Sequence, residues 1–167
     1  MFILETDRTL LRPFKIEDGP SLFELNLDPE VLKYTGDIPF NTLDDANRFV
    51  KKYIQTQLQG LGRWAVIHKD NSNFLGWCGL KYTLELDEYD IGFRFFKTYW
   101  NKGFATEVSK ACLDYGFRTL KLDAIVGRAM KQNGSSIRVL EKIGMRYAKT
   151  IKLNGDDWQV YKIERSS

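Results

Sequence analysis

The sequence predicts a mixed α/β domain whose central sheet is mostly antiparallel, with about seven strands flanked by about four helices. Three observations lead to this fold class. Short runs with apolar residues at alternating positions recur along the chain and predict strands. Several of these runs are joined by short polar turns that suit hairpins. The remaining strand-like runs are separated by segments with apolar residues every three or four positions, which predict helices.

One domain accounts for the whole chain. With 167 residues, of which 43% are hydrophobic and 14% aromatic, residues 1–167 can form a single compact unit with a substantial core. The 25 Lys and Arg residues against 22 Asp and Glu residues give a formal charge of only +3, with both signs spread along the chain. This balance argues against a nucleic-acid-binding specialist.

The first third of the chain predicts one strand followed by helices. A strand is expected at residues 9–12, and a first helix begins near Ile16, after a proline. A short helical turn follows at residues 28–34. A second helix is expected over residues 42–59, since Thr42 and the acidic residue three positions later resemble a capping box.

The middle of the chain predicts a hairpin, a third strand and a long helix. Residues 63–68 and 74–82 are strand-like and are joined by a polar turn. The third strand is residues 89–96, and an amphipathic helix of about four turns begins at Phe104. The chain ends with a strand at residues 124–130, a helix over 133–142 and two strands, 145–151 and 158–163.

Targeting and redox features indicate a cytoplasmic protein. The first residues carry charges of both signs and no long apolar run, so we expect no signal peptide here, and no window is apolar for long enough to cross a bilayer. Cys78 and Cys112 each lie in an apolar element. We expect buried free thiols rather than a disulfide or a nucleophile.

The turn Asn101-Lys102-Gly103 between the third strand and the long helix is a candidate phosphate site. Gly103 lets the backbone tighten, so the free amides of the first helical turn can point together at an anion. The helix dipole and the charge of Lys102 add to this attraction. The alternative is a glycine that only makes the connection. Neither GxxxxGK[ST] nor GxGxxG occurs in the chain, which argues against the standard nucleotide-binding motifs.

A second motif, Asn133-Gly134-Ser135-Ser136, precedes a helix that stops at Gly144. Taken alone, it describes a well-capped helix in which Asn133 and Ser136 satisfy backbone donors. Its place after a strand, a candidate phosphate turn, a long helix and another strand makes it more informative than a cap.

Four segments in this order resemble the GNAT superfamily of acyl-CoA-dependent N-acetyltransferases, and most closely its Rim-type branch, which includes ribosomal-protein-alanine N-acetyltransferases. The segments are ETDRTLLRPFKIED, DPEVLKYTG, IGFRFFKTYWNKGFATE and NGSSIRVLEKIGMRY. The resemblance covers nearly the whole chain and implies the acyl-CoA N-acyltransferase fold, with acetyl-CoA as cosubstrate and no metal.

The resemblance also implies which residues bind acetyl-CoA. The splayed strand of the family would pair its backbone with the pantetheine arm, and Asn133 and Ser136 would lie near the pantetheine and the thiol. Trp100 stands where the superfamily has Arg or Gln, which leaves the backbone amides and Lys102 to bind the pyrophosphate. On the strand, the matching residues are Phe93, Arg94 and Phe95; in the turn, they are Trp100, Asn101, Lys102, Gly103, Phe104, Ala105 and Thr106.

The catalytic groups are less clearly indicated. Many family members protonate the departing thiolate with a tyrosine at the position of Leu140, so Ser136 or water is the candidate replacement here. Asp90, with Glu88 beside it, is the candidate general base on the cofactor strand. His68 is expected to be a surface imidazole.

The acceptor is a primary amine of unknown kind: a protein N-terminus, a polyamine or a small-molecule amine. It should meet the first two helices and the last hairpin, where large aromatic residues could line a groove or belong to the core. These aromatic candidates are Tyr34, Phe40, Trp64, Trp77, Tyr82 and Trp158. The alternatives are an acyl-CoA-binding sensor or scaffold without activity, and a nucleotide-binding protein that uses the same turn. Edge strands near the C-terminus make a homodimer plausible. No membrane partner is expected.

Overall fold

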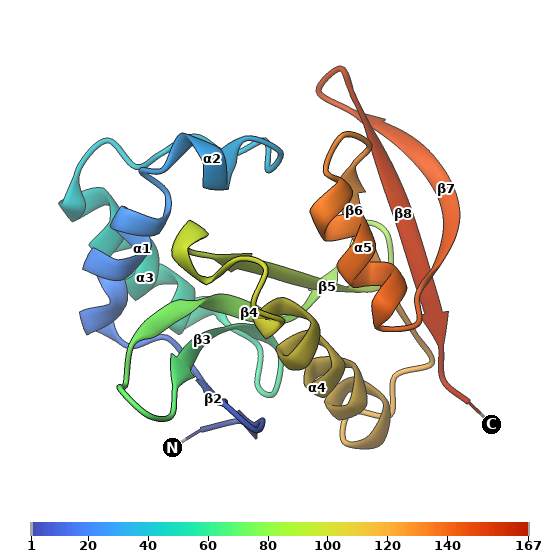
Figure 1. Ribbon diagram of the computed structural model, residues 1–167, viewed down its shortest axis with the longest axis horizontal. Helices are drawn as coiled ribbons and strands as arrows, with labels where there is room; N and C mark the ends of the chain where they lie inside the picture. The colour runs from blue at the N-terminus through green and yellow to red at the C-terminus, as the bar shows by residue number, and fades with distance from the viewer. Residues whose placement is uncertain (1, 167) are drawn as a thin grey trace.

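The computed structural model describes residues 2–166, which form one sheet with helices on both faces (Figure 1). Its strands lie in the order β1-β2-β3-β4-β5-β6-β8-β7. Their bounds are β1 Leu4–Glu5, β2 Thr9–Arg12, β3 Gly62–His68, β4 Phe74–Thr83, β5 Glu88–Phe95, β6 Ala124–Met130, β7 Arg146–Leu153 and β8 Asp156–Glu164.

Five α-helices and two short 3-10 turns connect the strands of the described chain. The helices are α1 Gly19–Leu25, α2 Pro29–Leu32, α3 Leu43–Thr56, α4 Phe104–Arg118 and α5 Gly134–Lys142. The 3-10 turns are η1 Ile16–Asp18 and η2 Lys97–Tyr99. The expected cap of α3 is present, because the Thr42 hydroxyl accepts a hydrogen bond from the Asp45 amide at 3.1 Å.

The predicted fold class is confirmed, with small differences in count. All strand pairs are antiparallel except β5 with β6. The sheet has eight strands rather than about seven because the two-residue strand β1 pairs with β2, and a strand that short has no detectable alternation in sequence. The short turn expected at residues 28–34 is a helix, α2, capped by the Asp28 carboxylate.

The sheet separates two apolar cores. Helix α4 covers one face, where Val108 and Cys112 pack against strand residues such as Leu80 and Ile91. Helices α1 and α3 cover the other face, where Leu22, Leu25 and Val50 form a smaller cluster. Both faces of the central strands are therefore buried along part of their length, which explains their apolar sequences.

The two cysteines are buried free thiols, as expected. They are distant in sequence, but their sulfur atoms lie 3.7 Å apart in the core under α4. Burial raises the pKa of the Cys112 thiol well above its usual value, and the neighbouring Cys78 raises it further. The neutral thiol is therefore strongly favoured, and Cys112 is a packing residue rather than a nucleophile.

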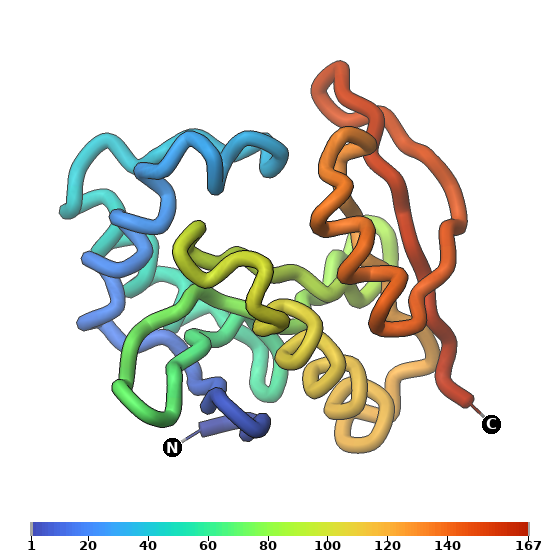
Figure 2. Tube along the Cα trace, in the orientation of Figure 1, coloured from blue at the N-terminus to red at the C-terminus, as the bar shows by residue number. Residues whose placement is uncertain are grey.

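Strands β5 and β6 pair over only two positions before they diverge. Asp90 lies opposite Val126 and Ile91 opposite Gly127. Beyond this point β6 continues with β8 alone, while β5 continues with β4 through Phe95. Figure 2 shows the chain on either side of this divergence, with α2 in blue on one side and α5 in orange on the other.

Two further observations bear on the predictions about a membrane partner and a homodimer. No helix among residues 2–166 is long and apolar enough to span a membrane. Strand β7 lies at an edge of the sheet and is exposed along almost its whole length, and Tyr147 on it is 54% exposed. A homodimer through this edge stays a prediction.

A buried ion pair fixes where α1 begins. The Arg12 guanidinium donates to both oxygens of Asp18, at 2.7 and 2.9 Å, and the Lys15 amide donates to the same carboxylate at 2.7 Å. The Asp18 side chain is only 7% exposed. Its removal would leave the Arg12 charge without its partner in a nearly buried position.

We predict that Asp18→Ala lowers the free energy of unfolding by about 2–4 kcal/mol, because it breaks a nearly buried, doubly bonded pair. Urea denaturation followed by circular dichroism measures this loss. Asp123→Ala is the matched control: it also removes a carboxylate paired with an arginine, but the Asp123 side chain is 93% exposed, so the loss should stay below about 1 kcal/mol. Equal losses in the two variants would contradict the structural role of Asp18.

Candidate active site

The divergence of β5 from β6 opens a groove of about 620 Å³, called here the β5 groove. It is bounded by the end of β5, the segment from Tyr99 to the start of α4, the start of α5, and α2 with the residues after it. Three parts of the chain that are far apart in sequence, residues 30–35, 93–106 and 133–142, therefore meet around one cavity.

The floor of the β5 groove is a free strand edge. Among the described residues, no strand pairs with Gly92–Phe95 on the side that faces β6. The backbone amides and carbonyls on that side must find other partners, because unpaired backbone groups are costly once they lose water. Phe93, Arg94 and Phe95 line the groove here. An extended ligand with amide groups could pair with this edge as an added strand would.

One end of the groove is the predicted phosphate turn. Gly103 is the N-cap of α4 and has φ 81° and ψ 2°, a left-handed conformation that favours glycine. No side chain of residues 2–166 caps this helix start. The amides of Phe104, Ala105 and Thr106 therefore open toward the groove that these residues line, together with the dipole of a 15-residue helix. This arrangement suits an anion such as a pyrophosphate.

Arg8, which we did not identify from sequence, holds this turn from behind. Its guanidinium donates to the Lys102 carbonyl at 2.9 Å and to the Glu107 carboxylate at 2.8 Å, and it lies 4.0 Å from the centre of the Phe104 ring. Thr6 donates to the same carboxylate at 2.6 Å. Arg8 brings a positive charge to the turn, where Trp100 replaces the charged or polar residue of the family pattern.

The electrostatics of Glu107 show how firmly this attachment is made. Partial burial by itself would raise the pKa of Glu107, but the hydrogen bonds from Thr6 and Arg8 and the charge of Arg8 outweigh it and hold the pKa below the usual 4.5. Glu107 therefore remains an anion at neutral pH and ties the N-terminal segment to the first turn of α4.

The opposite wall is the second sequence motif. The Asn133 side chain accepts from the Ser136 amide at 3.3 Å, so it caps α5, and its amide group donates to the Ser136 hydroxyl at 3.0 Å. Both residues also line the β5 groove. Leu140, at the position of the family tyrosine, is only 2% exposed and packs against Gly127 and Ile91. Tyr34 and Tyr99 also line the groove, and the Tyr99 hydroxyl accepts a hydrogen bond from the Asn73 side chain at 3.4 Å.

Two predicted site residues are absent from the lining of the β5 groove. The Lys102 side chain is not among the described groove-lining groups. Asp90 points to the opposite face of β5, where it pairs with Arg63 and Arg128 at 3.1 Å each, one through each carboxylate oxygen. Glu88 also binds Arg128, at 2.5 Å. Because both oxygens of Asp90 already hold guanidinium groups, this geometry argues against a general base and for a structural tie between strands.

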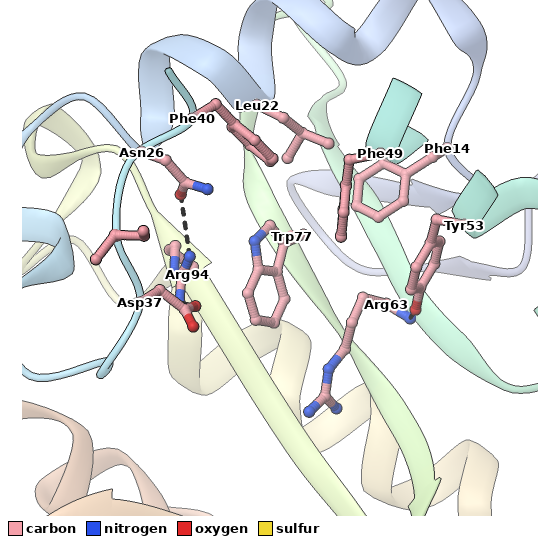
Figure 3. A pocket seen from close by; sticks show the side chains of 11 residues that line it. Phe14, Leu22, Asn26, Asp37, Phe40, Phe49, Tyr53, Arg63, Trp77 and Arg94 are labelled. Carbon is pink, nitrogen blue, oxygen red and sulfur yellow. Dashed lines mark hydrogen bonds and ion pairs between the residues drawn. The ribbon is translucent and has the colours of Figure 1, made fainter. Parts of the chain in front are cut away.

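A second cavity, of about 300 Å³, lies on that opposite face between the sheet and α1 and α3 (Figure 3). We call it the aromatic pocket. Its walls are the rings of Phe14, Phe40, Phe49, Tyr53 and Trp77. Arg94 lines both the aromatic pocket and the β5 groove, so the two cavities meet at this residue.

Polar contacts organise the pocket around Trp77. Its ring lies between two guanidiniums, with Arg94 at 5.3 Å and Arg63 at 5.5 Å from the ring centre. Arg94 donates to Asn26 at 3.0 Å, as the dashed line in Figure 3 shows, and to Asp37 at 2.7 Å. Asp37 thus brings a carboxylate to the junction of the two cavities.

The sequence identified only part of this pocket. Of the aromatic residues considered for the acceptor, Phe40 and Trp77 line the pocket and Tyr34 lines the groove. Trp64 is 1% exposed and belongs to the core. Phe49 and Tyr53 were missed, although their four-residue spacing on a helix is a readable signal that both rings share one face.

Comparison with known proteins supplies the family. Residues 8–146 match the family model described as an acetyltransferase (GNAT) domain. The chain belongs to the GNAT acetyltransferase family. It is 32% identical over 162 residues to the uncharacterized N-acetyltransferase YnaD of Bacillus subtilis, covering 95% of this chain and 93% of that protein. Members of the family catalyse acetyl-CoA-dependent acetyl transfer, and the chain is an enzyme of this class.

Two further comparisons bear on fold and acceptor. The crystal structure of a GNAT family acetyltransferase from Bacillus anthracis superposes on this structure with a TM-score of 0.85. The two sequences are 32% identical, and the match covers 98% of each chain. Spermidine N(1)-acetyltransferase of Escherichia coli is 26% identical over 138 residues, which cover 80% of this chain and 70% of that enzyme.

The β5 groove fits acetyl-CoA on the geometry of this GNAT chain itself. The free edge of β5 suits the amide-bearing pantetheine arm, and the uncapped start of α4 at Gly103 suits the pyrophosphate. A Cβ at Gly103 would lie 3.4 Å from the end of the Arg8 side chain, which is an ordinary contact, so the positive φ rather than lack of space favours glycine here.

We predict that Gly103→Val weakens CoA binding more than tenfold, about 1.4 kcal/mol or more, because a β-branched residue cannot keep φ at 81° and the turn must change shape. Isothermal titration with CoA measures the change. Gly155→Val is the matched control, since Gly155 has φ 84° in the β7–β8 turn and an added Cβ would meet nothing within 4 Å. Both variants should lose about 1–2 kcal/mol of stability; an unchanged CoA affinity in Gly103→Val would remove the turn from the site.

Proposed function

We propose that the protein transfers the acetyl group of acetyl-CoA, bound in the β5 groove, to a primary amine that enters from the aromatic pocket. The observation that carries this proposal is the position of Arg94, which lines both cavities, so that they adjoin across one strand. A cosubstrate on one face of β5 and an amine on the other can therefore meet at the free strand edge, which favours direct transfer in a ternary complex.

Acetyl transfer needs a group that stabilises the thioester oxygen and a group that protonates the departing thiolate. Acetyl-CoA supplies the thioester, with its acetyl group and its leaving thiolate. A backbone amide of the free edge near Phe93–Phe95 would stabilise negative charge on the thioester oxygen. Ser136 would donate a proton toward the sulfur, since its hydroxyl lines the groove and is held by Asn133.

Proton removal from the amine needs a different group from Asp90. Glu30 lines the β5 groove and Asp37 lines the aromatic pocket. Either carboxylate is better placed than Asp90, whose oxygens are held by two arginines. We propose that one of them accepts the proton through water, because both are open to solvent.

The acceptor could be a protein N-terminus, a polyamine or a small-molecule amine. The similarity to Escherichia coli spermidine N(1)-acetyltransferase favours a polyamine, but it stands at 26% identity. A CoA-binding sensor without activity is the second candidate, and the replacement of the family tyrosine by the buried Leu140 favours it.

Turnover with free amines separates the enzyme from the sensor. Purified protein is incubated with acetyl-CoA and pooled primary amines, and released CoA thiol is measured with a thiol reagent. We expect thiol release above the rate without amine, together with acetylated amine detected by mass spectrometry. CoA binding without any acetylated product would contradict the enzymatic proposal and support the sensor.

We predict that Ser136→Ala lowers kcat about ten- to hundredfold, within the range for loss of a general acid, while the Kd for CoA changes less than about threefold. Steady-state kinetics and titration with CoA measure the two quantities. Ser135→Ala is the matched control, since Ser135 also lines the groove but bonds only weakly to Arg138, at 3.4 Å. Equal kcat values in the two variants would show that water or a tyrosine protonates the sulfur.

A further inference from the structure

The aromatic pocket differs in character from a site for a multiply charged amine. Its wall rings form one connected cluster: Phe40 contacts Phe49 at 5.5 Å between ring centres, Phe49 stacks on Tyr53 at 5.9 Å, and Tyr53 meets Phe14 edge-on at 5.6 Å. The Tyr53 hydroxyl is engaged at 2.6 Å by the Arg63 amide. The cluster therefore presents mostly ring surface to an occupant.

The aromatic pocket is lined by fewer carboxylates than guanidiniums. Asp37 is the single acidic residue among the described residues that line the pocket, and Arg63 and Arg94 line it as well. Asp37 is paired with Arg94, and Arg63 is paired with Asp90 behind the pocket. The site is thus close to neutral overall, with two guanidiniums beside the Trp77 ring face.

A polyamine would meet unfavourable conditions here. After one amine has reached the thioester, its remaining ammonium groups would lie among rings and beside two arginines. Burying a charge without a partner costs several kcal/mol, and the Trp77 face that could hold a cation already has guanidiniums near it. An apolar, flat group carries no such penalty and gains from contact with the rings.

Resting on the acetyltransferase function proposed above, we infer that the acceptor is a small primary amine carried on an aromatic or similarly flat apolar group. The ring of the acceptor lies against Phe49 and Tyr53. Its amine points to the Asp37 carboxylate, which lies beside Arg94 where the pocket meets the β5 groove and which can receive the ammonium before it loses its proton. The pocket volume of about 300 Å³ limits the apolar group to a compact one.

A panel of amines tests the class. At saturating acetyl-CoA, kcat/KM is measured for 2-phenylethylamine and tryptamine, for spermidine and spermine, and for a short peptide with a free N-terminal alanine. We expect the two aryl amines to exceed every other acceptor by about tenfold or more, the range that pocket contacts can supply. A higher kcat/KM for a polyamine or the peptide overturns the inference while the acetyltransferase function stands.

A pair of variants tests the location. Phe49 is 47% exposed, so Phe49→Ala should leave the fold intact. It should lower kcat/KM for tryptamine about three- to tenfold with an unchanged Kd for CoA. Tyr147→Ala is the matched control, because Tyr147 is a ring of similar exposure, 54%, on β7. Equal effects in the two variants would overturn the assignment of the pocket.

Direct binding covers the case in which no amine is turned over. Titration of tryptamine into the CoA complex should then give saturable binding that Phe49→Ala weakens and Tyr147→Ala does not. Absence of turnover with such binding would reject the proposed transferase activity and keep the ligand class. Absence of binding by both aryl amines would overturn the inference itself.

Discussion

The site depends on the early end of pairing between β5 and β6. Pairing stops at Ile91 and Gly127, and two sets of contacts hold the strands at that point. On one face, Leu140 of α5 packs onto Gly127, where an added Cβ would come within 2.7 Å of it. On the other face, Arg128 bridges from β6 to Glu88 and Asp90. These contacts join the strands firmly up to Ile91 and leave the rest of β5 with a free edge.

Attachments from distant parts of the chain then complete the groove around this edge. Arg8 and Thr6 bind Glu107 and hold the start of α4, while Asn133 caps α5 on the other side. The third wall, from α2, closes toward the C-terminal hairpin, since a Cβ on Gly36 would lie 3.8 Å from the Trp158 ring. The cavity is therefore built from elements that are each fixed by their own hydrogen bonds and packing.

Local features of the site could be predicted from sequence, and long-range ones could not. Gly103, the periodicity of α4 and the Asn133 cap are set by residues within a few positions of one another, so their patterns are visible in the sequence. The resemblance to the family added the fold and the cofactor. Asp90 looked like a free carboxylate because its partners, Arg63 and Arg128, come from other strands. Arg8 was missed for the same reason, since its partner Glu107 lies 99 residues away.

The central claim is that the free edge of β5 and the start of α4 bind acetyl-CoA together. Amide hydrogen exchange with and without CoA tests it most directly, because exchange reports the protection of individual backbone segments. The account predicts slower exchange at Gly92–Phe95 and at residues 104–106 when CoA is bound, with little change in the β7–β8 hairpin. Binding of CoA that leaves both segments unprotected would contradict the account.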